Sequence, residues 1–170
     1  MNKFFIGFII LFIGGFGILG IAQAGLYPVA IIGSDIIWAK ELNQATSAAL
    51  TYYAKLGAQI TPQIHKEVKR AVLDKITENA LILKNLEKDG GRIELEAAVD
   101  EILKKYSAMP DLGPAAAQLY GLELEDFYEM VLIPQAQHEL LEKKLSAKNQ
   151  KFNDWLTAEK QAASVILLVK

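Results

Sequence analysis

The sequence contains no cysteine and only two histidines among its 170 residues. The lack of cysteine excludes disulfides, thiolate nucleophiles and cysteine-ligated metal sites. There is also no excess of charge of one sign, because 18 lysines and arginines face 20 aspartates and glutamates, for a net charge of −2. A nearly balanced chain lacks the basic surface that nucleic-acid binding requires, so we expect no nucleic-acid partner.

Recognisable catalytic and metal-binding motifs are missing as well. His65 and His138 each lie among polar residues on expected helices, where two solvated histidines are a simpler interpretation than a shared metal site. The carboxylate pairs at 94–96 and 123–125 lie at expected helix starts, where the helix dipole favours negative charge. No G-x-S-x-G nucleophile elbow occurs. We therefore expect no cofactor, no metal and no catalysis.

The most unusual feature that is present is a long apolar run near the start. Phe4 to Ala22 is 19 residues without a charged side chain. As a helix this run spans roughly 28 Å, close to the thickness of a bilayer's hydrocarbon core. It is longer than the roughly 7–15 apolar residues of a secretory signal. We expect residues 1–24 to form one retained transmembrane helix, with these side chains in the membrane: Phe4, Ile10, Phe12, Ile18 and Ala22.

The charge around this run predicts its orientation. Lys3 and the chain start are the only cations before it, so the positive-inside tendency keeps the start cytoplasmic and exports the body. The expected localisation is thus a single-pass membrane protein with an extracytoplasmic body. Ala22 and Ala24 before Gly25 have the small-x-small form of a cleavage site. The alternative is therefore a protein secreted after cleavage near Ala24.

Residues 25–170 are expected to form one mainly helical domain, since about 145 residues can bury a core of their own. The run 27–33 is short, apolar and β-branched between Pro28 and Gly33, which predicts a strand. The run 164–169 predicts a second strand at the other end. Two strands alone are marginal in water unless helices cover them. We therefore expect the N- and C-terminal strands to pair and close the helical domain.

Helical periodicity covers most of the rest of this body. Ser34 or Asp35 is expected to cap the first helix, and Thr61 the second, with Pro62 at its first position. Pro134 is expected to kink the longest late helix, because it removes one backbone hydrogen bond. The predicted helices cover about 36–56, 62 to Gly90–Gly91, 92–106, 114–120, 123–145 and 149–163.

Methionine and aromatic side chains are concentrated between residues 106 and 130. Methionine repacks easily and tyrosine adds a polar tip, so both suit contacts with varied apolar segments. One interpretation makes this region a peptide-binding surface, and the other makes most of its side chains part of the domain core. The candidate peptide-binding residues are Met109, Leu112, Tyr120, Tyr128 and Met130.

The order of these features resembles the N-terminal domain of SurA-type chaperones, shared in outline with the PrsA and PpiD foldases. The resemblance extends over about residues 28 to 170 and consists mostly of apolar spacings. It is carried by Val72–Leu73–Asp74, Leu81–Leu83, Gly91, Leu95 to Ile102, Glu125–Asp126–Phe127 and Trp155–Leu156.

The sequence departs from the family pattern in identifiable places. Gly33–Ser34–Asp35 replaces the usual Asn-Gly-Glu turn, and Pro134 interrupts a helix that is usually plain. The parvulin isomerase domain that often follows in the family is not part of this sequence, so we expect no isomerase activity from it unless a partner chain supplies that domain.

The resemblance implies a membrane-anchored, extracytoplasmic, chaperone-like domain that binds apolar segments of unfolded or exported polypeptides without catalysis. The expected partners are those polypeptides and, through the first helix, the lipid bilayer. The alternative is a dedicated interaction or assembly subunit that docks one fixed membrane partner.

Overall fold

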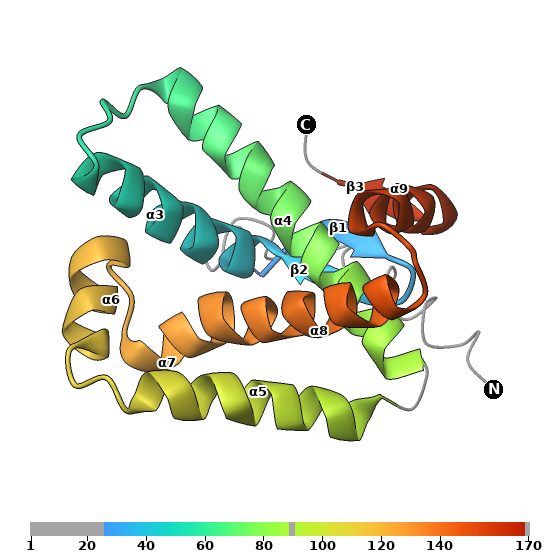
Figure 1. The fold of residues 1–170 in the computed structure, drawn as a ribbon. Coiled ribbons are helices and arrows are strands. Elements are labelled where there is room, and N and C mark those ends of the chain that lie inside the picture. The colour runs from blue at the N-terminus through green and yellow to red at the C-terminus, as the bar shows by residue number, and fades with distance from the viewer. Residues whose placement is uncertain (1–25, 89–90, 169–170) are drawn as a thin grey trace.

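Helices make up most of the structure, a computed structural model that describes residues 26–88 and 91–168 (Figure 1). Its elements are β1 (Pro28–Ile32), β2 (Asp35–Trp38), α3 (Ala39–Lys55), α4 (Pro62–Lys88), α5 (Arg92–Ser107), α6 (Leu112–Tyr120), α7 (Leu124–Phe127), the π-helical turn η1 (Tyr128–Leu132), α8 (Ile133–Ala147), α9 (Phe152–Ala162) and β3 (Val165–Leu167).

The membrane segment expected in residues 1–24 lies outside the described residues, so it stays a prediction, as does the domain boundary at residue 25. Among the helices that the structure does describe, none combines the length and the apolar character needed to cross a bilayer.

In the described part of the chain, three strands form one antiparallel sheet in the order β2-β1-β3. β3 pairs with β1 from Ala30↔Leu167 to Ile32↔Val165, which confirms the predicted pairing of the terminal strands. Ala30 and Ile32 are fully buried because helices cover this part of the sheet. The sheet therefore joins the two ends of the body and takes part in its core.

The prediction that a helix begins near residue 36 was wrong, because β2 occupies this stretch. Gly33 has a φ of 63°, a conformation that glycine adopts without strain, and the chain reverses there into a hairpin with β1. The two isoleucines of β2 then pair with β1. Helix α3 begins only at Ala39, and its N-cap is Trp38, so neither Ser34 nor Asp35 caps it.

The main core lies between the sheet and α4, with α8 and α9 around them. Leu81, Ile82 and Leu86 of α4 are each at most 2% exposed, so the later half of this helix is buried on more than one side. The start of α4 is also as predicted, since the Ile64 backbone N–H donates to Thr61 Oγ1 at 3.2 Å. Trp155 of α9, 5% exposed, completes this core.

A second core fills the other end of the body, where α3 meets α6, α7 and η1. Its buried residues are Ala48, Ala116, Leu122, Phe127 and Leu132. Gly121, with a φ of 67°, ends α6, in agreement with the predicted helix over 114–120. A π-helical turn, η1, lies just before Pro134 and separates α7 from α8, so the helix predicted over 123–145 is interrupted there, and a kink at Pro134 stays a prediction. A wider turn relieves the clash between the proline ring and the preceding carbonyls.

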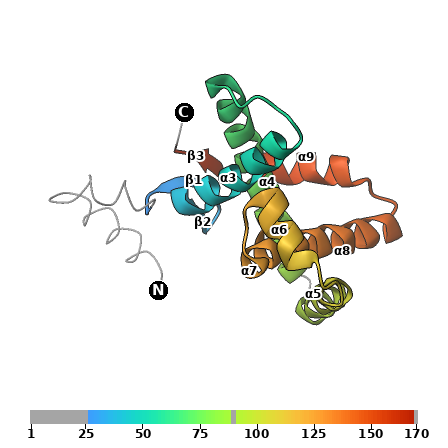
Figure 2. The same cartoon turned by 90° about the vertical axis from the view of Figure 1, so that its left-hand side faces the viewer.

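These contacts place two groups of elements on either side of α4. In Figure 1, α8 and α5 run side by side in the lower half of the view, α3 lies above α8, and α4 runs diagonally from the top of the view down to α8. Figure 2 shows the same division from the side, with the sheet and α3 on one side and α5 with α8 on the other. Because α4 contacts both α3 and α8, it forms the floor between the two groups.

Candidate functional site

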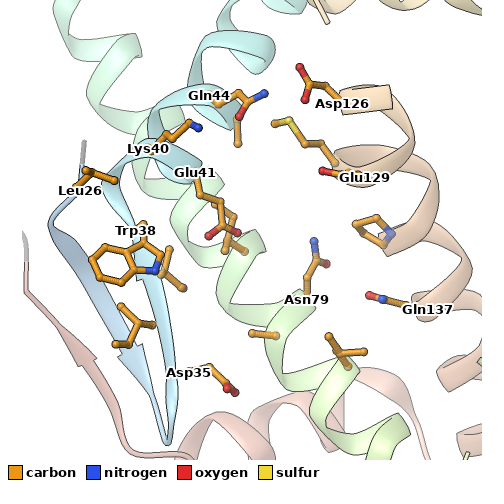
Figure 3. A pocket seen from close by; sticks show the side chains of 18 residues that line it. Leu26, Asp35, Trp38, Lys40, Glu41, Gln44, Asn79, Asp126, Glu129 and Gln137 are labelled. Carbon is orange, nitrogen blue, oxygen red and sulfur yellow. The ribbon is translucent and has the colours of Figure 1, made fainter. Parts of the chain in front are cut away.

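A groove of about 890 Å³ lies between these two groups (Figure 3). Residues of β2 and α3 line one wall, residues of α4 line the floor, and residues from α7 to α8 line the opposite wall. Its volume falls within the roughly 300–1,000 Å³ that is typical of ligand sites. We refer to this site as the central groove.

Apolar side chains cover most of the walls and floor of the central groove. Three of them are substantially exposed: Leu26 at 56%, Trp38 at 42% and Ile36 at 39%. Such exposed apolar groups around a cavity are typical of a binding surface. The other apolar lining residues are Ile37, Ala45, Ile76, Ala80, Leu83, Met130 and Pro134.

Two side-chain amides line the groove from different elements. Asn79 of α4 and Gln137 of α8 both point into it in Figure 3, and Gln137 is only 9% exposed. Asn79 Oδ1 is buried and has no hydrogen-bond partner among the described residues. A buried acceptor without a partner costs about 1–3 kcal/mol.

Glu41 connects the groove to the start of α3. It lies in the first turn of that helix, where an acidic side chain can reach back to the N-cap backbone N–H. Burial raises the pKa of Glu41, and hydrogen bonding from the Trp38 backbone N–H partly opposes this rise. The carboxylate is therefore partly desolvated at the groove wall while it holds the junction between β2 and α3.

The five residues predicted to bind peptides do not form one surface. Met130 lines the central groove. Leu112, Tyr120 and Tyr128, together with Met130, are half-buried against the second core. Met109 lies outside the groove and is 47% exposed. The structure thus brings one of the five to the groove, and a role in peptide binding stays a prediction for all of them.

Tyr120 in particular has a structural environment. Its ring stacks on Tyr52 with the centroids 5.0 Å apart and an interplanar angle of 5°, and it lies 5.5 Å from Phe127. Burial, with a smaller contribution from Tyr52, raises the pKa of its hydroxyl. These contacts tie α3 to α6 and α7, so replacing Tyr120 would disturb the second core.

Most groove residues were missed from the sequence, although one signal was present. Ile76, Asn79, Ala80 and Leu83 follow the i, i+3, i+4, i+7 spacing of one helix face, and a polar residue interrupts that face. The structure leaves this face half-buried on the groove floor. The sequence of β2 carries no comparable signal, because the residues around Trp38 are compatible with a helix as well as with a strand.

The histidines lie apart from the groove. His65 is exposed on α4. His138 is half-buried on α8, with its ring 4.3 Å from that of Phe152 and its Nδ1 3.8 Å from Glu142. Across residues 26–88 and 91–168, no three histidine, aspartate or glutamate side chains are grouped closely enough to hold a metal ion.

Comparison with known proteins relates this geometry to a family. The family model of the SurA-like N-terminal domain matches residues 1–120. The chain belongs to the SurA-like N-terminal domain family. No catalytic domain is among the family models that match. No curated protein and no solved structure matches the chain.

The SurA-like match covers only part of the central groove. It ends with α6, so it includes the wall from β2 and α3 and the floor from α4. The opposite wall, with Glu129, Met130 and Gln137, follows the matched range. The groove of this SurA-like chain is therefore built from the family segment together with the helices that come after it.

Proposed function

We propose that this SurA-like chain is a membrane-anchored, extracytoplasmic chaperone that holds apolar segments of unfolded or exported polypeptides without catalysis. The single observation that carries the proposal is the central groove, which is open, largely apolar and located in a SurA-like N-terminal domain. Burial of apolar surface is non-directional, so such a groove can accept many sequences. Affinity for any one of them is expected to be weak.

The edge of the sheet supports an extended conformation for the bound segment. β2 is an outer strand of the described sheet and also lines the groove. An outer strand has backbone groups that are not used within its sheet, and an extended peptide can pair with them. A client segment could thus combine backbone contacts along β2 with side chains in the apolar groove.

A groove-filling variant tests this function. Ala45→Trp places a large ring at the groove wall, whereas Ala54→Trp adds the same ring at an exposed position of the same helix. The full chain, purified in mild detergent, is mixed at equal molar ratio with a chemically denatured client, and aggregation is followed by light scattering. We expect the wild type and Ala54→Trp to suppress aggregation and Ala45→Trp to lose most of this effect.

Two results would contradict the proposal. One is no suppression by the wild-type chain while circular dichroism shows that it is folded. The other is equal suppression by both tryptophan variants, which would place the activity outside the groove. Capture of one partner at high occupancy, with no unfolded clients, would instead favour a dedicated assembly subunit.

The membrane anchor is tested separately by cell fractionation and intact-mass measurement. Phe4 to Ala22 supports the anchor through its length and lack of charge, and Lys3 supports an exported body. We expect the intact chain in the membrane fraction, with the body accessible to protease from the extracytoplasmic side. A mature protein that starts at Gly25 would show that the segment is a cleaved signal.

A further inference from the structure

The rim of the central groove carries a local excess of negative charge. Among its described lining residues, four are carboxylates and one, Lys40, is a cation. The acidic residues come from β2, α3, α7 and η1, so they lie on both sides of the groove (Figure 3). They are Asp35, Glu41, Asp126 and Glu129.

These carboxylates form no ion pair in the described part of the chain. The ion pairs found in the described part of the chain join other residues, along α4, α5 and α8 and between α5 and α8. None of the four rim carboxylates takes part in them. The chain as a whole is nearly neutral at −2, so the fold has gathered this charge from distant parts of the sequence.

The rim carboxylates favour ligand groups that donate hydrogen bonds, because ionised carboxylates are acceptors only. A lysine ammonium or an arginine guanidinium can satisfy them. A carboxylate on the ligand would add a further acceptor and would be repelled by the rim.

We propose that the groove selects extended polypeptide segments in which lysine or arginine lies next to apolar residues. This proposal rests on the proposed function and adds the charge of the preferred client. Apolar side chains of the segment contact the groove walls, and the basic side chain pairs with Glu41 or Glu129 across the groove. Partly exposed charge pairs each change affinity only a few-fold, so two pairs give a preference of roughly tenfold.

Three peptides test this charge selection. They share one apolar centre, which is flanked by two lysines, two serines or two glutamates. Their affinity for the full chain in uncharged detergent is measured by fluorescence anisotropy at low and high salt. We expect the lysine peptide to bind roughly tenfold more tightly than the glutamate peptide, with the serine peptide between them. Salt should reduce this difference, because it screens exposed charges.

Matched charge variants locate the effect. Glu41→Gln combined with Glu129→Gln removes two rim charges, and glutamine can still reach back to the N-cap of α3. Glu87→Gln combined with Glu101→Gln changes the net charge equally at exposed positions outside the groove. Only the rim pair should abolish the preference for lysine.

A second rim pair, Asp126→Asn with Glu129→Gln, leaves the start of α3 untouched and should act in the same way. Equal binding of the three peptides would overturn the charge selection while leaving the proposed function intact. The charge selection would also be overturned if Glu87→Gln combined with Glu101→Gln lost the preference for lysine to the same extent, because net charge would then explain the effect. Failure of all three peptides to bind would overturn the proposed function itself.

Discussion

Replacing Asn79 by leucine should stabilise the protein. Asn79 Oδ1 is buried without a partner in the described part of the chain, at a cost of about 1–3 kcal/mol. Leucine is of similar size and removes this cost. It also has the higher helix propensity, a gain of up to roughly 0.7 kcal/mol that has nothing to do with the groove.

Asn85→Leu is the matched control for this helix-propensity gain. Asn85 lies on the same helix, is also half-buried and does not line the groove. We therefore expect Asn79→Leu to exceed Asn85→Leu in free energy of unfolding by about 1–3 kcal/mol. For a chain of this size each kcal/mol raises Tm by about 2–4 °C, so the difference is measurable by thermal or urea unfolding.

The reasoning is refuted if Asn79→Leu is no more stable than Asn85→Leu in the same urea titration. The Asn79 carbonyl would then already have a hydrogen-bond partner in the folded protein, such as a buried water.

Two further predictions concern the packing of α5 against its neighbours. Gly91→Ala should lower the free energy of unfolding by about 1–3 kcal/mol, because its Cβ would lie 2.7 Å from the Leu86 carbonyl oxygen. Gly113→Ala is the control, since the nearest atoms to its Cβ would lie at 4.0 Å, and it should not destabilise the protein when both variants are unfolded with urea. The ion pair with Lys144 lowers the pKa of Glu94, so its stabilisation is present at neutral pH and is lost as the pH falls below the ordinary value of 4.5. Lys144→Met should therefore reduce the urea midpoint at pH 7, and a gap from the wild type that stays constant down to pH 3 would contradict this assignment.

The sequence by itself determined the features that depend on neighbouring residues. Thr61 and Pro62 mark the start of α4 because a capping oxygen and a fixed φ act within one turn. Gly121 ends α6 because its left-handed conformation is readily available to glycine. The short apolar runs at the two ends of the body indicated β1 and β3. Because an isolated strand is not stable in water, the sequence also predicted that these two strands pair with each other.

Only the tertiary structure decided β2 and the central groove. The stretch from Asp35 to Trp38 is compatible with a helix or a strand, and pairing with β1 selected the strand. On α4, the buried face with Leu81 and the groove face with Ile76 have the same helical spacing in the sequence. Periodicity tells which side chains share a face, whereas the positions of the neighbouring elements decide whether that face is covered. Here α3 and α8 both contact α4 and leave a groove between them. Carboxylates from distant parts of the sequence therefore lie around one apolar groove.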